Sequence, residues 1–124
     1  MKKAIYSSLS LLLLTFSGLF YPDFVVIGQD VSKDSPALPE EINKIVTASC
    51  MPCHSNTGGM LSRGKLNFTE WTTYSAESQK KKAEKVYSEL KKGAMPPKSA
   101  RETRPEIVPT KDQIDIIKKW SDSF

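Results

Sequence analysis

The 124-residue sequence predicts an all-α domain of three to four short helices. Apolar residues recur at helical spacing in several separate segments, and no segment alternates apolar and polar residues as a half-buried strand does. Stretches rich in glycine and proline separate these segments and keep the predicted helices short. We find no internal repeat, so a single small domain is expected.

The chain begins like a secretory signal peptide, over residues 1–28. Lys2 and Lys3 precede a leucine-rich apolar run, which is the order found in signal peptides. An uncleaved membrane anchor is the alternative. A spanning helix needs about 20 mostly apolar residues, and this one would have to include Pro22 and Asp23. We therefore expect export to the periplasm or to the outer face of the cytoplasmic membrane, with membrane contact only through an uncleaved segment.

Residues 29–38 have the polar, proline-containing composition of a linker, and the folded domain is expected at residues 39–124. The net charge of the whole chain is +4. A mildly basic exported domain would be attracted weakly to acidic proteins or anionic surfaces. Nucleic acid is not an expected partner, because the lysines alternate with glutamates and the chain leaves the cytoplasm.

The first helix is predicted over residues 39–49. A proline stands at its start and acidic residues occupy its first turn, as helix N-termini favour. Its apolar residues Ile42, Ile45 and Val46 share one face. Residues 55–65 contain three glycines and are predicted to form a loop.

A short helical segment is predicted over residues 66–78, with Asn67 or Thr69 as its cap. Phe68 and Trp71 would face inward. A longer helix is predicted over residues 79–92, where Ala83, Val86, Tyr87 and Leu90 fall at helical spacing.

Gly93 is expected to end that helix. The following stretch, residues 94–109, has four prolines and is predicted to be irregular. Thr110 and Gln113 have the spacing of a capping box for a last helix. The apolar side of that helix would consist of Ile114, Ile117 and Trp120.

Short helices joined by long loops bury too little apolar surface to make the domain stable by themselves. Small scaffolds of this kind usually need disulfides, a metal or a large apolar cofactor. In this chain, only Cys50, Cys53 and His54 could form a disulfide or bind such a metal or cofactor.

Those three residues lie in the segment SCMPCHSN, residues 49–56. A Cys50–Cys53 disulfide would close a very short loop and stabilise the fold little. A redox-active pair of this kind needs a neighbouring βαβ pattern, which is missing here. A structural zinc site needs four protein ligands, and this chain offers three Cys and His residues, all in one short stretch.

The pattern C-x-x-C-H in an exported chain instead predicts covalent attachment of one haem c. Two thiols can form thioether bonds to the porphyrin vinyl groups, and the adjacent histidine can bind the iron. Positions i, i+3 and i+4 lie on one side of a helical turn. Cys50, Cys53 and His54 can therefore all face one flat ring, which would supply the missing core.

A methionine is the expected sixth ligand, since electron carriers use Met or His and the chain has no second histidine. Met1 would leave with the signal peptide, and Met51 is held between the two cysteines on the attachment side. Met60 follows His54 closely and would have to cross the ring edge. Met95 lies beyond a helix, between a glycine and two prolines that would stiffen its loop. The alternative for Met95 is simple gap filling.

The segments CMPCHSN, GKLNFTEW and GAMPP, with a terminal helix ending near Trp120, resemble the c-type haem-binding domains of bacterial exported proteins. These domains are related to the class I cytochromes c. The resemblance covers about residues 40–122. It implies a small α-helical fold with crossed N- and C-terminal helices, axial ligation by His54 and Met95, and electron transfer. The chain departs from the family between His54 and Leu66, which is short, and after Pro97.

The predicted function is therefore electron transfer by Fe(II)/Fe(III) cycling in a mono-haem c-type cytochrome domain. We do not expect an enzyme, because no nucleophile, general base or substrate pocket is apparent. One alternative is a haem-based sensor or ligand-binding module with a displaceable sixth ligand. A haem-free thiol oxidoreductase is a less favoured one. The expected partner is a redox protein, and an acidic one would suit the charge.

Two groups of basic residues have a functional and an ordinary interpretation. Arg63 could bind a haem propionate, or it could be a solvated loop residue. The lysines of residues 80–85 could attract an acidic partner. Because glutamates share that segment, an ordinary solvated helix face is favoured.

Overall fold

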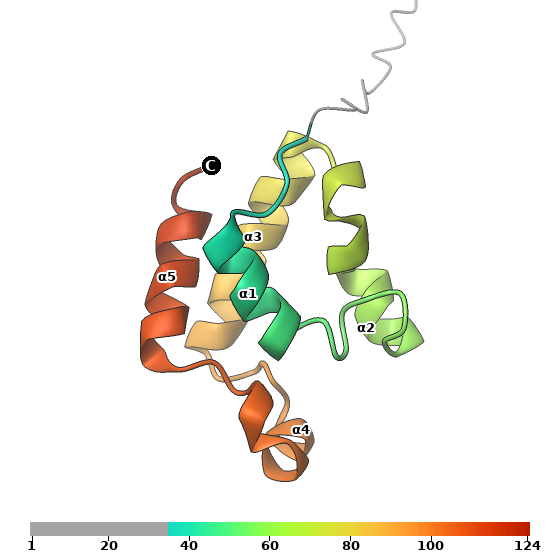
Figure 1. Cartoon of the computed structure of the whole chain (residues 1–124), viewed down its shortest axis with the longest axis vertical. Coiled ribbons are helices and arrows are strands. Elements are labelled where there is room, and N and C mark those ends of the chain that lie inside the picture. Colours follow the sequence, from blue (N-terminus) through green and yellow to red (C-terminus); the bar gives the residue numbers. More distant parts are fainter. Residues whose placement is uncertain (1–34) are drawn as a thin grey trace, which may run out of the picture.

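The computed structural model describes residues 35–124, and all of its regular elements in that range are helices (Figure 1). The predicted all-α class is thus confirmed. The predicted signal peptide and most of the predicted linker lie outside the described residues. The elements are, in order, α1 (Glu40–Ser49), α2 (Met60–Lys65), η1 (Phe68–Thr73), α3 (Ala76–Lys91), α4 (Lys98–Thr103), η2 (Pro105–Ile107) and α5 (Lys111–Ser121), where η marks a 3₁₀ helix.

Three longer helices, α1, α3 and α5, form the body of the domain. The first and the last of them, α1 and α5, pack against each other, and α3 packs along α5. Figure 1 shows α1 running obliquely in front of α3, with α5 to one side and α2 to the other. The short helix α4 lies at the opposite end of the domain from the entering chain. The N- and C-terminal helices of the domain therefore meet, as the family resemblance implies.

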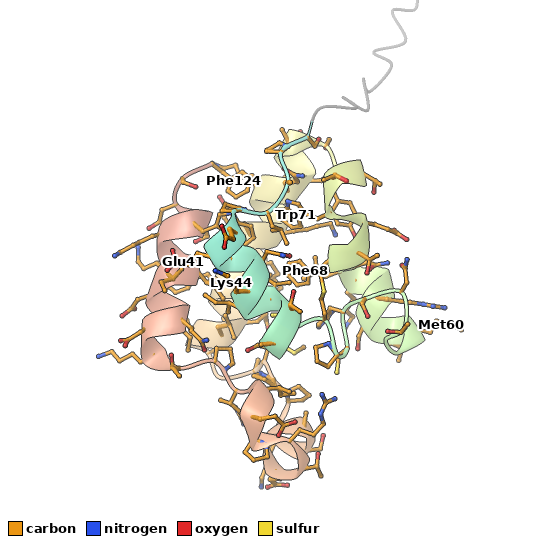
Figure 2. The ribbon with its side chains drawn as sticks, in the orientation of Figure 1. Glu41, Lys44, Met60, Phe68, Trp71 and Phe124 are labelled. Atoms are coloured by element: carbon orange, nitrogen blue, oxygen red, sulfur yellow. The ribbon has the colours of Figure 1, made fainter. Side chains whose placement is uncertain are left out.

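The core is built from the apolar faces of these helices and from η1. Phe68 and Trp71 of η1 are each 3% exposed and lie in the interior behind α1 (Figure 2). The Trp71 ring stands 5.4 Å from that of Trp120 in α5, centroid to centroid. Each large apolar side chain buried in this way contributes roughly 1.5–3 kcal/mol. The aliphatic part of the core consists of Ile42, Ile45, Val46, Ala83, Val86, Leu90 and Ile117.

Several predicted helix ends agree with the structure because local side chains set them. Asn67 caps η1, since its side chain accepts a hydrogen bond from the Thr69 amide. Thr110 and Gln113 form the predicted capping box at the start of α5. The third helix begins at Ala76, three residues before its predicted start, because the Ser75 hydroxyl caps it.

The two stretches predicted to be irregular contain short helices, so these predictions were wrong. In residues 55–65 the adjacent glycines precede α2 and do not interrupt it. In residues 94–109 Pro97 is the N-cap of α4, and Pro105 is the first residue of η2. Proline costs nothing there, because an amide at a helix start has no partner within the helix.

The chain that enters α1 is attached to the body through Gln79 of α3. This side chain is fully buried, and its amide nitrogen donates to the carbonyl oxygens of Pro36, at 3.1 Å, and Trp71, at 2.9 Å. Leu38 packs against the same core. Within residues 35–124, no helix has the length and apolar character needed to cross a bilayer.

Candidate functional site

A cavity of about 350 Å³ opens between the end of α1, the end of α2, one face of α3 and the segment around α4. This volume is within the range of roughly 300–1,000 Å³ that is typical of ligand and cofactor sites. The cavity is lined by all four residues predicted as site residues: Cys50, Cys53, His54 and Met95. Folding thus places Met95, distant in the sequence, at the same cavity as the CMPCH segment.

The CMPCH segment forms a hydrogen-bonded turn directly after α1, which ends at Ser49. The His54 amide donates to the Cys50 carbonyl oxygen at 2.8 Å, which is the i to i+4 bond of an α-helix. The Cys53 amide bonds the same oxygen at 3.1 Å. The side chains at 50, 53 and 54 consequently share one side of the turn.

The orientation of the His54 ring is set by two backbone carbonyl groups. Its Nδ1 atom lies 3.1 Å from the carbonyl oxygen of Ser62 and 3.1 Å from that of Leu66. Carbonyl oxygens only accept hydrogen bonds, so Nδ1 carries the proton. The Nε2 atom is then left with the lone pair that a metal ligand needs.

The loop after His54 is folded tightly back on the CMPCH turn. The Phe68 amide donates to the His54 carbonyl oxygen at 2.9 Å. The side-chain amide of Asn67 donates to the side chain of Asn56 at 2.6 Å. At Gly58, an added Cβ atom would stand 2.0 Å from the Cys53 carbonyl oxygen. This loop therefore packs against the CMPCH turn, and the close approach requires glycine at position 58.

Met95 is brought to the cavity by the way α3 ends. Gly93 has a φ of +66°, and its amide bonds the Leu90 carbonyl oxygen, while the Ala94 amide bonds that of Glu89. These two bonds form a Schellman motif, which turns the chain sharply at the helix end. The Arg101 guanidinium adds a 2.7 Å bond to the Gly93 carbonyl oxygen. Met95 itself is 39% exposed.

The other two described methionines face elsewhere. The Met51 sulfur accepts a hydrogen bond from the Thr47 hydroxyl at 3.8 Å, and its side chain packs against the core. Met60 is 76% exposed at the outer edge of the domain (Figure 2). Of the methionines in residues 35–124, Met95 alone lines the cavity.

The sequence profile of the Haem-binding domain family matches residues 60–123, which is about half of the chain. The chain belongs to the haem-binding domain family. No curated protein matches it, and no solved structure does. The match begins shortly after the CMPCH segment. Residues of that segment and residues of the matched region line the same cavity.

The lining of the cavity suits the haem that the family name implies. Its floor is apolar and includes Leu66, Phe68, Val86, Leu90 and Ile107. Phe68 was expected to face inward, as it does. Ile107 was missed, because it lies in the stretch predicted to be irregular. A flat apolar macrocycle is compatible with this lining. The two thiols, the imidazole and the thioether of the protein would then surround it.

The charged residues of the cavity differ from those that the sequence suggested. Arg63 does not line the cavity, and its guanidinium donates to the Asn56 carbonyl oxygen at 2.9 Å. Three lysines do line it: Lys65, Lys82 and Lys85. Lys85 is solvated, as expected for this helix face, with a side chain that is 70% exposed, yet it and Lys82 also border the cavity.

The Cys50 thiol lies in a largely apolar environment. Burial, with the neighbouring Cys53 adding to it, raises the pKa of the Cys50 thiol to about 12. Nucleophilic or redox-active cysteines instead have lowered pKa values. Among residues 35–124, no group of three or more His, Cys, Asp and Glu side chains is placed to hold a metal ion by itself.

Proposed function

We propose that this haem-binding domain is a mono-haem c-type cytochrome that carries electrons. One haem c would be attached through Cys50 and Cys53, with His54 and Met95 as axial ligands. The observation that carries the proposal is the shared cavity: two thiols, an imidazole and a thioether line one apolar pocket. Haem bound there would supply one-electron chemistry through the Fe(II)/Fe(III) couple.

Each residue would have a distinct role. The two thiols fix the cofactor to the end of α1, so that it is retained in either oxidation state. The carbonyl groups of Ser62 and Leu66 hold the His54 ring and its tautomer. Met95 stabilises the reduced state and raises the potential. The apolar floor lowers the local dielectric constant, which further tunes that potential.

The thiol-oxidoreductase alternative is disfavoured by the thiols themselves. A catalytic cysteine needs a thiolate at working pH, whereas burial raises the pKa of the Cys50 thiol to about 12. We propose a carrier and not an enzyme, exported to the periplasm or to the outer face of the cytoplasmic membrane. Its partner would be a redox protein that accepts or donates the electron.

A haem-based sensor is a second candidate, because Met95 is 39% exposed and lies in a loop outside the helices. A loop ligand of this kind could be displaced by a small molecule. The two candidates differ in how firmly the Met95 thioether would be held.

The visible spectrum of protein from an exporting, haem-loading host tests both candidates. The carrier should contain covalently bound haem that resists extraction by acidic organic solvent and shows the red-region sulfur-to-iron band of the ferric state. Met95→Ala should keep the haem, lose this band and lower the reduction potential, since a methionine ligand raises it. Met60→Ala is the matched control and should change neither.

A colourless protein would refute the haem assignment. Haem without the sulfur band in the unchanged protein would favour the sensor. Loss of the band in the Met60→Ala variant, with retention in Met95→Ala, would show that the ligand assignment is wrong.

A further inference from the structure

The charged residues of the cavity are gathered on one side of it. Lys65 ends α2, while Lys82, Lys85 and Glu89 belong to one face of α3. The lining contributed by the segment after α3 is apolar apart from its backbone and includes Pro96, Pro97, Ala100, Ile107 and Pro109. The cavity therefore has a charged edge along α2 and α3 and an apolar side along the segment after α3.

Haem has the same division. Two carboxylates, the propionates, project from one edge of the macrocycle, and the rest of its periphery is apolar. We infer that Lys65, Lys82 and Lys85 bind the haem propionates and fix which edge of the macrocycle faces α2 and α3. This inference rests on the proposed function, since it assigns further residues to the same haem.

The charge balance of the lining supports the assignment. Three lysines and one glutamate leave two positive charges in excess when His54 is neutral. Glu89 is ionised at neutral pH, because its hydrogen bond with Lys85 lowers its pKa. Two propionates would neutralise this excess of two positive charges.

Lys82 is held at this edge by contacts within the domain. Its Nζ atom donates to the Lys65 carbonyl oxygen at 3.1 Å and stands 4.3 Å from the centre of the Tyr74 ring. Neither partner carries a full negative charge, so the ammonium charge is retained for a ligand. Because Lys82 binds the last residue of α2, it also joins α2 to α3 at the cavity edge.

The Lys85 Nζ atom forms an ion pair with the Glu89 carboxylate at 2.8 Å. The same carboxylate lies 3.9 Å from the Nζ atom of Lys92. The Glu89 side chain is 24% exposed and that of Lys85 is 70% exposed. Lys85 can thus turn toward a propionate while Lys92 continues to face Glu89. By contrast, Lys81 on the same helix pairs with Glu77 and does not line the cavity.

The test measures the ionisation of the propionates in haem-loaded protein. The chemical shifts of the haem methyl groups in the ferric protein are followed by NMR as a function of pH. Nearby ammonium groups lower the pKa of a carboxyl group. The triple variant Lys65→Gln, Lys82→Gln, Lys85→Gln should titrate about 1 pH unit or more above the unchanged protein.

Three further proteins complete the comparison. Lys81→Gln removes one positive charge from α3 outside the cavity and should leave the pKa of the propionates unchanged. The triple arginine variant keeps the charges and should titrate like the unchanged protein. Lys82→Gln alone should give a smaller shift in the same direction, which keeps the test decisive if the triple variant does not accumulate.

Identical propionate titration in the unchanged protein, in the triple glutamine variant and in Lys82→Gln would overturn the assignment. Such a result would leave these lysines to an acidic redox partner, and the proposed function would stand. An unchanged protein that contains no haem would instead refute the proposed function, and the propionate assignment with it.

Discussion

Gly58→Ala should disrupt the CMPCH turn, although position 58 lies outside the motif. A Cβ atom at this position would stand 2.0 Å from the Cys53 carbonyl oxygen and 2.5 Å from its carbonyl carbon. Real Cβ contacts stay above 3.0 Å, so the two backbone segments would have to move apart by about 1 Å. Both contact atoms belong to the backbone, and no side-chain rotation can relieve the clash.

The cost follows from what holds these two segments together. The Gly58 amide donates to the Ser55 carbonyl oxygen at 2.9 Å, and the Phe68 amide donates to that of His54 at 2.9 Å. Separating the segments weakens these bonds or strains the turn. Overpacking of this kind typically costs about 1–3 kcal/mol. In a domain of this size each kcal/mol lowers the melting temperature by roughly 4–8 °C.

Thermal unfolding of the three alanine variants in this loop provides the assay. Gly59→Ala has no atom within 4 Å of its new Cβ. Gly59 is the N-cap of α2, so the loss of a favoured cap residue and the lower entropy of the unfolded chain oppose each other, and stability should change by only a few tenths of a kcal/mol. Gly64→Ala lies inside α2, also without a contact, and should stabilise by roughly 0.5–1 kcal/mol. Gly58→Ala should be the least stable and should bind less haem per chain. Equal melting temperatures for Gly58→Ala and Gly59→Ala would refute this reasoning.

Two other substitutions test the site. The double variant Cys50→Ala, Cys53→Ala should give a colourless protein of low stability, because it cannot attach the haem proposed to complete the core; a folded and equally heat-stable double variant would contradict this. Gly93→Ala should cost about 1–2 kcal/mol in denaturant unfolding, since a residue with a φ of +66° favours glycine. Its new Cβ would meet only the Arg101 side chain, at 3.7 Å, so the cost is conformational, and Gly93→Asn should recover part of the loss. Equal unfolding midpoints for the unchanged protein and Gly93→Ala would show that the Schellman turn is not needed.

Features set by neighbouring residues could be predicted from the sequence. The capping box of Thr110 and Gln113, the cap at Asn67 and the helix end at Gly93 are all present in the structure. Each depends on hydrogen bonds or backbone angles within a few residues. The common side of Cys50, Cys53 and His54 follows in the same way from the spacing of one helical turn.

The short helices α2 and α4 could not be predicted from the sequence, because local patterns in so few residues are weak. Six residues of α2 or α4 carry too little periodicity to signal a helix, and isolated helices of that length are unstable in water. They form here because the rest of the domain fixes their ends. Prolines that mark irregular structure elsewhere then serve as starts for α4 and η2.

The sequence by itself thus determined the helical class, the C-x-x-C-H motif and the candidate ligand pair. Ligation by His54 and Met95 stays a prediction. Only the tertiary structure decided which residues share the cavity: it brings Met95 to Cys50, Cys53 and His54, and it includes Lys82 and Lys85 but not Lys81 or Arg63. Helix caps and turns depend on a few adjacent residues, whereas a cavity depends on how α3 packs on α5 and where the following loop returns. Those contacts join residues far apart in the chain, and no local pattern encodes them.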